Sequence, residues 1–253
     1  MSLLRIATLL TIPFLVSTAS ISSAGAIQNG GFSSGLVEWN TVGDAAVVDE
    51  SAIITNSSTI GDDPLGVTYN FSGYDPVSVT NLESFLGVSP GFLSPSNSLF
   101  GAIEGSLISQ KFSANSGDIL SFDWRFLTND SAVEIIPGFL DADYAFVAIA
   151  GNNFFQLDVL STSGSTLLSP TSDPSVVFQK STPLSSYSLK LPSTSLYTLS
   201  FGVVDVGGSA NTSALLIDNV KLEQTKAVPE PSLTAAILLL SGLGVVGAVV
   251  RKQ

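Results

Sequence analysis

Residues 118–126, Asp118-Ile-Leu-Ser-Phe-Asp-Trp-Arg-Phe126, alternate between apolar and polar side chains from Leu120 onward. The apolar residues that share one face of an extended chain are Leu120, Phe122, Trp124 and Phe126. Because successive side chains of a β-strand point to opposite faces, this pattern predicts a strand with one buried side and one solvent-facing side. Trp124 is therefore expected in the core rather than in a binding site.

The same period of two recurs on both sides of this stretch. It is clear in residues 197–203, and further strand candidates are residues 45–55, 101–112, 144–150, 154–160, 176–179, 186–191 and 214–223. Glycine, proline, asparagine and serine clusters separate them, and residues 61–98 are so rich in these residues that we expect a long loop region there. Many short strands without intervening helices predict an all-β protein, an antiparallel β-sandwich that is jelly-roll-like.

Composition excludes several kinds of chemistry. The 253 residues include neither cysteine nor histidine, which rules out disulfides, thiol nucleophiles, histidine-ligated zinc and Ser-His-Asp triads. The net charge of −12 argues against a nucleic-acid partner, because phosphate binding needs clustered lysine and arginine. Charged residues make up only 12% of the chain, about half the usual share, and mean hydropathy is +0.44, which directs attention to apolar segments.

The first apolar segment is residues 1–26. A single basic residue, an apolar run and the small-residue motif Ala24-Gly25-Ala26 follow in the order that defines a secretory signal peptide. We expect signal peptidase to cleave after Ala26. The alternative is a hydrophobic first helix of the fold.

The second apolar segment is residues 232–250, which contain no charge. At about 1.5 Å per residue, a helix of this length spans about 28 Å, close to the thickness of the bilayer core. The sequence predicts a single transmembrane helix there, preceded by a linker over residues 224–231. Arg251 and Lys252 lie in the basic tip, residues 251–253, which the positive-inside rule places on the cytoplasmic side.

The tripeptide Pro229-Glu230-Pro231, the uncharged span and the terminal basic pair together resemble a PEP-CTERM sorting signal. The resemblance covers about the last 26 residues. It implies a bacterial protein that is anchored transiently in the inner membrane, processed by an exosortase and left at the cell surface or in the extracellular matrix. A plain C-terminal anchor after a proline-rich turn is the alternative.

Residues 27–223 form the predicted β-sandwich domain. Residues 27–228 carry 20 acidic and six basic residues, a net charge of −14, and the whole chain has 40 serines. The margins of the domain, Gln28-Asn-Gly-Gly-Phe32 with Trp39 beyond it and Leu216-Ile-Asp-Asn-Val-Lys-Leu222, resemble those of galactose-binding-like, carbohydrate-binding-module jelly rolls.

In an extended strand, Asp218 points to the same face as Leu216, Val220 and Leu222, because all four have even numbers and so share parity. Strand alternation therefore predicts that the Asp218 carboxylate lies on the core-facing side. A buried carboxylate needs a proton, hydrogen bonds or a metal. The jelly-roll resemblance implies that an acid here can help to hold a structural Ca²⁺ with the N-terminal segment, although Ser33 stands where those folds often have another acid. Hydrogen bonding to backbone at a strand end is the alternative, and no other cofactor is expected.

Two further features are candidate sites, one acidic and one aromatic. Asp141 and Asp143 alternate, so they are expected to bind a cation together or to lie in a solvated loop. Trp39, Tyr69 and Tyr74 are candidates for stacking on sugar rings, with core or loop packing as the alternative.

We therefore expect an exported, non-catalytic surface or matrix protein that interacts weakly with carbohydrate, such as an extracellular polysaccharide. A purely structural matrix component is the first alternative. A glycoside hydrolase that uses paired carboxylates is the second, and no motif singles out such a pair.

Overall fold

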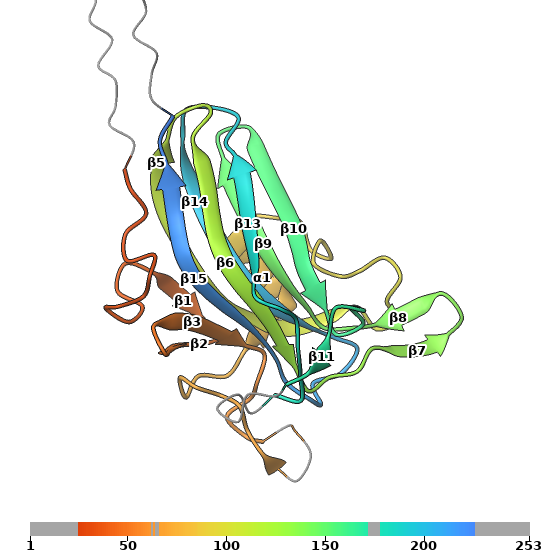
Figure 1. Ribbon diagram of the computed structural model, residues 1–253. Coiled ribbons are helices and arrows are strands. Elements are labelled where there is room, and N and C mark those ends of the chain that lie inside the picture. The colour runs from red at the N-terminus through yellow and green to blue at the C-terminus, as the bar shows by residue number, and fades with distance from the viewer. Residues whose placement is uncertain (1–24, 62, 64–65, 172–177, 226–253) are drawn as a thin grey trace, which may run out of the picture.

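The computed structural model describes residues 25–61, 63, 66–171 and 178–225, most of which lie in two antiparallel β-sheets packed face to face (Figure 1). The first sheet, sheet A, contains β1 (Asn40–Val42), β4 (Val77–Ser78), β5 (Ala102–Ala114), β9 (Tyr144–Gly151), β10 (Phe154–Thr162) and β14 (Ser195–Val206). Its strand order is β1-β5-β14-β9-β10, and β4 also pairs with β5.

The second sheet, sheet B, runs in the order β11-β12-β6-β15-β3-β2, with β13 also paired to β6. Its strands are β2 (Asp44–Val48), β3 (Ser51–Thr55), β6 (Ile119–Thr128), β11 (Ser169–Pro170), β12 (Lys180–Ser181), β13 (Ser185–Lys190) and β15 (Ser213–Glu223). A separate hairpin of β7 (Val133–Ile136) and β8 (Phe139–Asp141) projects from one end of the sandwich (Figure 1). The predicted all-β antiparallel sandwich is confirmed.

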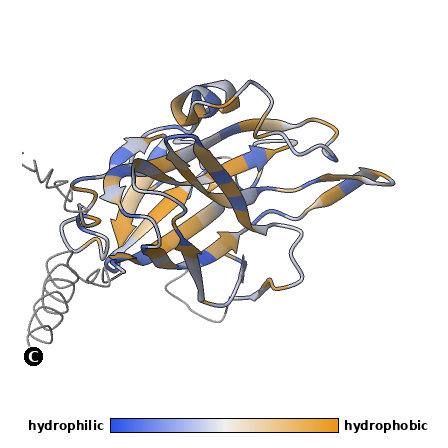
Figure 2. Ribbon diagram, turned by 90° about the horizontal axis from the view of Figure 1, so that it is seen from above, coloured by the Kyte–Doolittle hydropathy of each residue, from blue (hydrophilic) through white to orange (hydrophobic). Residues whose placement is uncertain are grey.

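The alternating pattern of β6 places its apolar face in the core as predicted. Phe122 and Phe126 are almost completely buried, and Trp124 is 9% exposed. Phe122 meets Phe201 of the opposite sheet edge to face, with ring centroids 4.7 Å apart. Strands of both sheets show apolar stretches in the view from above (Figure 2). Burial of these aromatic side chains, at about 1.5–3 kcal/mol each, supplies much of the driving force that holds the sheets together.

Two strand candidates differ from the structure. Residues 45–55 form the hairpin β2–β3 rather than one strand, because Asp49 and Glu50 adopt left-handed φ angles of 48° and 60° and reverse the chain. Of residues 176–179, the first two lie outside the described residues. Phe178 and Gln179 are not in a strand, and pairing begins at Lys180.

The expectation of a loop throughout residues 61–98 is also wrong in part, because helix α1 (Val79–Leu86) lies within it. The helix ends at Gly87, whose φ of 71° is a left-handed conformation that glycine adopts without strain. Leu82 of α1 is fully buried in a cluster with Leu107 and Phe146 of sheet A. This packing against the outer side of the sheet stabilises a helix that is too short to form alone.

The predicted export segments fall outside the described part of the chain. These are residues 1–24, which include Ala24, and residues 226–253, which include Pro229, Glu230, Pro231, the span 232–250, Arg251 and Lys252. Among the described residues, no helix has the length and apolar character needed to cross a membrane.

Candidate functional site

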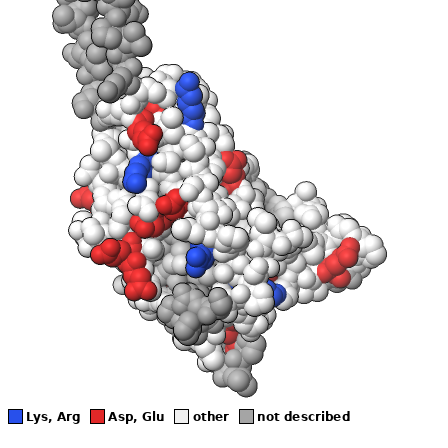
Figure 3. Space-filling model, viewed as in Figure 1, with Lys and Arg blue, Asp and Glu red and all other residues white. Residues whose placement is uncertain are grey.

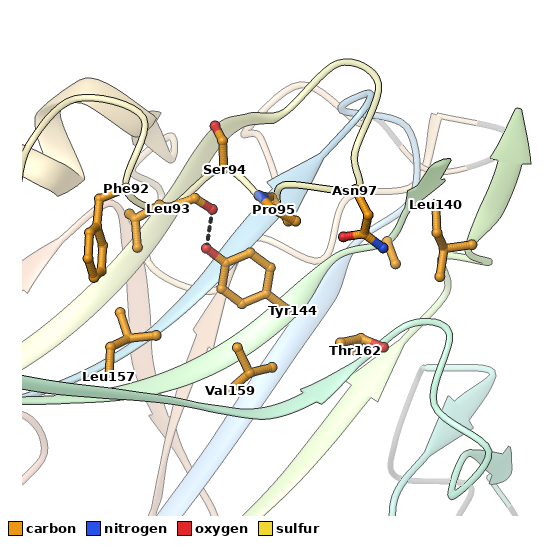
Figure 4. Close-up of a pocket in the computed structure, with 11 residues that line it drawn as sticks. Phe92, Leu93, Ser94, Pro95, Asn97, Leu140, Tyr144, Leu157, Val159 and Thr162 are labelled. Carbon is orange, nitrogen blue, oxygen red and sulfur yellow. Dashed lines mark hydrogen bonds between the residues drawn. The ribbon is translucent and has the colours of Figure 1, made fainter. Parts of the chain in front are cut away.

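A pocket of about 250 Å³ lies between sheet A and the loop of residues 87–101, which connects α1 to β5 (Figure 4). The strands β9 and β10 form its floor, the loop forms one wall, and the end of β8 closes one side. The residues that line it are Phe92, Leu93, Ser94, Pro95, Asn97, Leu140, Ala142, Tyr144, Leu157, Val159 and Thr162.

A buried carboxylate fixes the first half of the loop. Glu83, on α1, is only 1% exposed. Its two oxygens accept hydrogen bonds from the backbone N–H groups of Gly91, at 3.0 Å, and Leu93, at 2.9 Å. Hydrogen bonds to a charged acceptor are about twice as strong as neutral ones, so Glu83 ties the loop to the helix.

Tyr144 fixes the same segment from the sheet. Its hydroxyl donates a hydrogen bond to the Leu93 carbonyl (Figure 4). Burial, with a smaller effect from the charge of Glu83, raises the pKa of Tyr144. The phenol therefore stays protonated and remains a donor.

A second buried acid fixes the other half of the loop. Asp141, 6% exposed, accepts hydrogen bonds from the Ser98 hydroxyl and from the Leu99 N–H at 3.0 Å. The Leu140 N–H donates to the Asn97 carbonyl at 2.8 Å. Both halves of the loop are thus held in place, and the pocket is formed in advance of any ligand.

The two ends of the pocket differ in chemistry. Phe92 and Leu157 lie at one end, and Asn97 and Thr162 lie at the other (Figure 4). Phe92 is 50% exposed and is supported edge to face by Phe155 at 5.6 Å. Within the described part of the chain, the side chains of Asn97 and Thr162 make no hydrogen bond. The pocket therefore offers an apolar wall and two spare polar groups to a ligand.

None of these pocket residues was a sequence candidate, and the aromatic candidates lie elsewhere. Trp39 is 6% exposed, and its ring packs between Phe32 and Phe201, so it has no free face for stacking. Tyr69 packs against Phe178 at 5.2 Å. Tyr74 is 73% exposed. The structure does not bring these three aromatic residues together in the pocket.

Asp218 faces outward, and the prediction that it faces the core is wrong. A β-bulge in β15 between Asp218 and Lys221 adds a residue to the strand, where Asn219 has a left-handed φ of 55°. Ile217 is buried before the bulge and Val220 after it, so the bulge reverses the parity that was used for the prediction.

The carboxylate of Asp218 is bound by its neighbour. It accepts hydrogen bonds from the backbone N–H of Asn219 at 2.6 Å and from the Asn219 side-chain amide at 3.2 Å. The N-terminal segment is close, because the Gly30 carbonyl accepts a hydrogen bond from Val220 at 2.9 Å. Among the described residues, no group of three or more acidic side chains is placed to hold a metal ion. The structural Ca²⁺ stays a prediction.

Asp143 is 2% exposed, so it does not lie in the solvated loop that was one expectation for it. Its carboxylate accepts hydrogen bonds from the Asn56 amide at 2.9 Å, the Ser213 hydroxyl at 2.8 Å and the Val206 N–H at 3.0 Å. Burial, followed by the charge of Asp130, raises the pKa of Asp143 to about 7. Asp141 and Asp143 therefore bind different partners, and both stabilise one end of the sandwich.

The comparisons with known proteins give weak likenesses. The sequence matches no protein-family model and no curated protein. Among solved structures, a carbohydrate-binding module in complex with β-1,4-galactotriose has 10% identity and a TM-score of 0.36, with 80% of this chain and 100% of that chain covered. A module specific for non-crystalline cellulose has 12% identity and a TM-score of 0.37, with 79% and 95% covered. The adhesin domain of Lys-gingipain from Porphyromonas gingivalis has 14% identity and a TM-score of 0.35, with 79% and 99% covered. At these TM-scores the likeness carries no conclusion about ligands.

Proposed function

We propose that the sandwich is a non-catalytic binding domain and that the pocket beneath residues 87–101 holds a neutral sugar residue of an extracellular polymer. The observation that carries this proposal is the preformed wall of the pocket. Two buried carboxylates, those of Glu83 and Asp141, hold an otherwise irregular loop in place. A site that is ordered before binding avoids the entropy cost of ordering a loop around its ligand.

The chemistry of the pocket suits a sugar. A pyranose ring has an apolar C–H face and a rim of hydroxyl groups, and specificity in small-molecule pockets comes from a few polar groups on a largely apolar lining. Phe92 and Leu157 offer apolar surface at one end, while Asn97 and Thr162 offer hydrogen bonds at the opposite end. The volume of about 250 Å³ suits a ligand as small as a single ring.

The pocket does not favour the hydrolase alternative. A glycosidase needs two carboxyl groups on either side of the scissile bond. No acidic residue is among those that line this pocket. A purely structural matrix role remains the alternative, and it predicts that no glycan binds.

Filling the pocket should abolish glycan binding. Val159 is 53% exposed and lines the pocket, so Val159→Trp places an indole where the ligand would lie. We expect the full chain to bind at least one neutral oligosaccharide on a glycan array that includes β-1,4-galactotriose and cello-oligosaccharides, and we expect Val159→Trp to reduce that affinity at least about tenfold. Val37→Trp is the matched control, because Val37 is 58% exposed in the N-terminal segment and does not line the pocket. If the wild-type protein bound none of the glycans on the array, the result would favour the structural role.

We also propose that the protein is exported and sorted through its C-terminal signal. The support is the order of the sequence features, namely the leader, the Pro229–Pro231 motif, the uncharged span and the basic tip. Mass spectrometry of surface-exposed protein should show a mature N-terminus near Ile27 and loss of residues after the motif. Surface protein that retains Gln253 would contradict the sorting proposal.

A further inference from the structure

Among the residues that the structure describes, Arg125 on sheet B has no counter-ion. It lies on β6, on the polar face of the strand, opposite Leu216 of β15. Its Nε atom is buried and has no hydrogen-bond partner. Within the described part of the chain, the guanidinium forms no hydrogen bond or ion pair. Buried donors are nearly always satisfied, so this group calls for an explanation.

The two acids that share a hollow with Arg125 already accept hydrogen bonds. Asp123 and Asp218 are paired across β6 and β15, and both line a hollow that reaches Arg125. The Asn219 amide donates to both carboxylates, at 3.0 Å and 3.2 Å, and the Ser186 hydroxyl donates to Asp123 at 2.6 Å. The Asn219 side chain at the bulge thus occupies part of the hydrogen-bond acceptor capacity of these two carboxylates, which would otherwise be available to the guanidinium.

On its other side, Arg125 borders a second hollow of about 230 Å³. This hollow is lined by residues of β11 and β12 and by the chain next to them, namely Ser169, Pro170, Thr171, Ser181, Thr182 and Pro183. None of the described residues that line it is acidic. The hydroxyls of Ser169 and Ser181 make no hydrogen bond to described residues, whereas Thr171 and Thr182 bind backbone groups. On the face of sheet B, basic side chains are few and stand apart from one another (Figure 3).

We propose that this hollow, the Arg125 hollow, binds a sugar that carries one carboxylate, that is, a uronic acid residue. A planar guanidinium can donate two parallel hydrogen bonds to one carboxylate, and no described residue occupies these donors of Arg125. The spare hydroxyls of Ser169 and Ser181 suit sugar hydroxyls, and the two proline rings offer apolar surface to a sugar ring. One guanidinium matches one carboxylate, and the nearby Asp123 and Asp218 repel ligands with denser negative charge.

The test is calorimetric titration of the full chain with oligogalacturonate, and with the neutral galacto-oligosaccharide of the same length. We expect binding of the acidic oligosaccharide that weakens as salt rises, since the pair is charged. Arg125→Gln should weaken it at least about tenfold. Arg125→Lys keeps the positive charge but loses the paired N–H donors of the guanidinium, so it should also weaken binding of the acidic oligosaccharide. Lys221→Gln, which removes an exposed charge from the same sheet, should bind as the wild type does.

Three results would overturn the proposal. They are the absence of oligogalacturonate binding by the wild type, unchanged binding by both Arg125 variants, and an equal loss in Lys221→Gln. Melting temperatures check that the variants are folded. If Arg125→Gln does not fold, the binding measured for Arg125→Lys tests the proposal in its place. The pocket in sheet A is tested separately, because Val159→Trp should leave oligogalacturonate binding intact and the Arg125 variants should leave binding of neutral glycans intact.

Discussion

Glu83→Ala is expected to lower the free energy of unfolding by about 2–4 kcal/mol and to abolish neutral-glycan binding by the pocket. The substitution removes the acceptor of the buried Leu93 N–H and of the more exposed Gly91 N–H, and a buried donor left without a partner costs about 1–3 kcal/mol. The wall that carries Phe92 would then lose its attachment to α1. Denaturant unfolding gives the stability change, and calorimetric titration with a neutral oligosaccharide gives the change in binding.

Glu134→Ala is the matched control. Glu134 also accepts a backbone N–H, that of Gly138 at 2.9 Å, but it is exposed on the β7–β8 hairpin. Water replaces the lost acceptor there. We therefore expect the free energy of unfolding to change by less than about 0.5 kcal/mol and glycan binding to stay unchanged. Equal effects of the two substitutions would contradict the role assigned to Glu83.

Raising the pH from 4 to 7 is expected to destabilise the protein through Asp143. The pKa of this carboxyl is about 7 in the folded protein, against an ordinary value of 3.8. Between these two pH values the folded state holds a proton that the unfolded state has released, so stability falls as the pH rises. The resulting loss of stability is on the order of a few kcal/mol. Below pH 4 both states are protonated, and above pH 7 the loss is complete.

Asp143→Asn should remove this contribution. We expect the unfolding free energy of the variant to decline less steeply than that of the wild type between pH 5 and pH 7. Asp75→Asn is the control: Asp75 is fully exposed, and hydrogen bonds from Thr59 lower its pKa, so its titration lies below this window. Identical pH profiles for the wild type and Asp143→Asn would show that Asp143 titrates normally.

Much of the fold could be predicted from local pattern. The alternation in residues 118–126 correctly placed Trp124 in the core, since burial on one face imposes a period of two. Helix α1 also has a local signal that was overlooked among the surrounding turn residues, because Ser78 precedes it, Leu82 lies on its buried face and Gly87 ends it. The inward prediction for Asp218 was wrong, because one residue in a left-handed conformation reverses parity. Asparagine favours that conformation, but the residue type alone does not show where a strand bulges.

The pocket could not be read from the sequence in the same way. It depends on contacts between residues far apart in the chain, such as Tyr144 with Leu93 and Asp141 with Ser98. One signal was available. Residues 144–149 are buried without alternation, and a continuous apolar run predicts that both faces of a strand are covered. That signal indicates a cover over sheet A, although it does not identify the loop that provides it.

The loop-covered pocket is expected to bind a neutral sugar. The most direct test is an NMR titration of the full chain with the neutral oligosaccharide that gives the strongest signal on the array, followed through backbone amide shifts. We expect the largest shifts in residues 92–97 and at Leu140, Tyr144, Val159 and Thr162, which line the pocket. Shifts confined to other parts of the molecule, or none at saturating ligand, would contradict it.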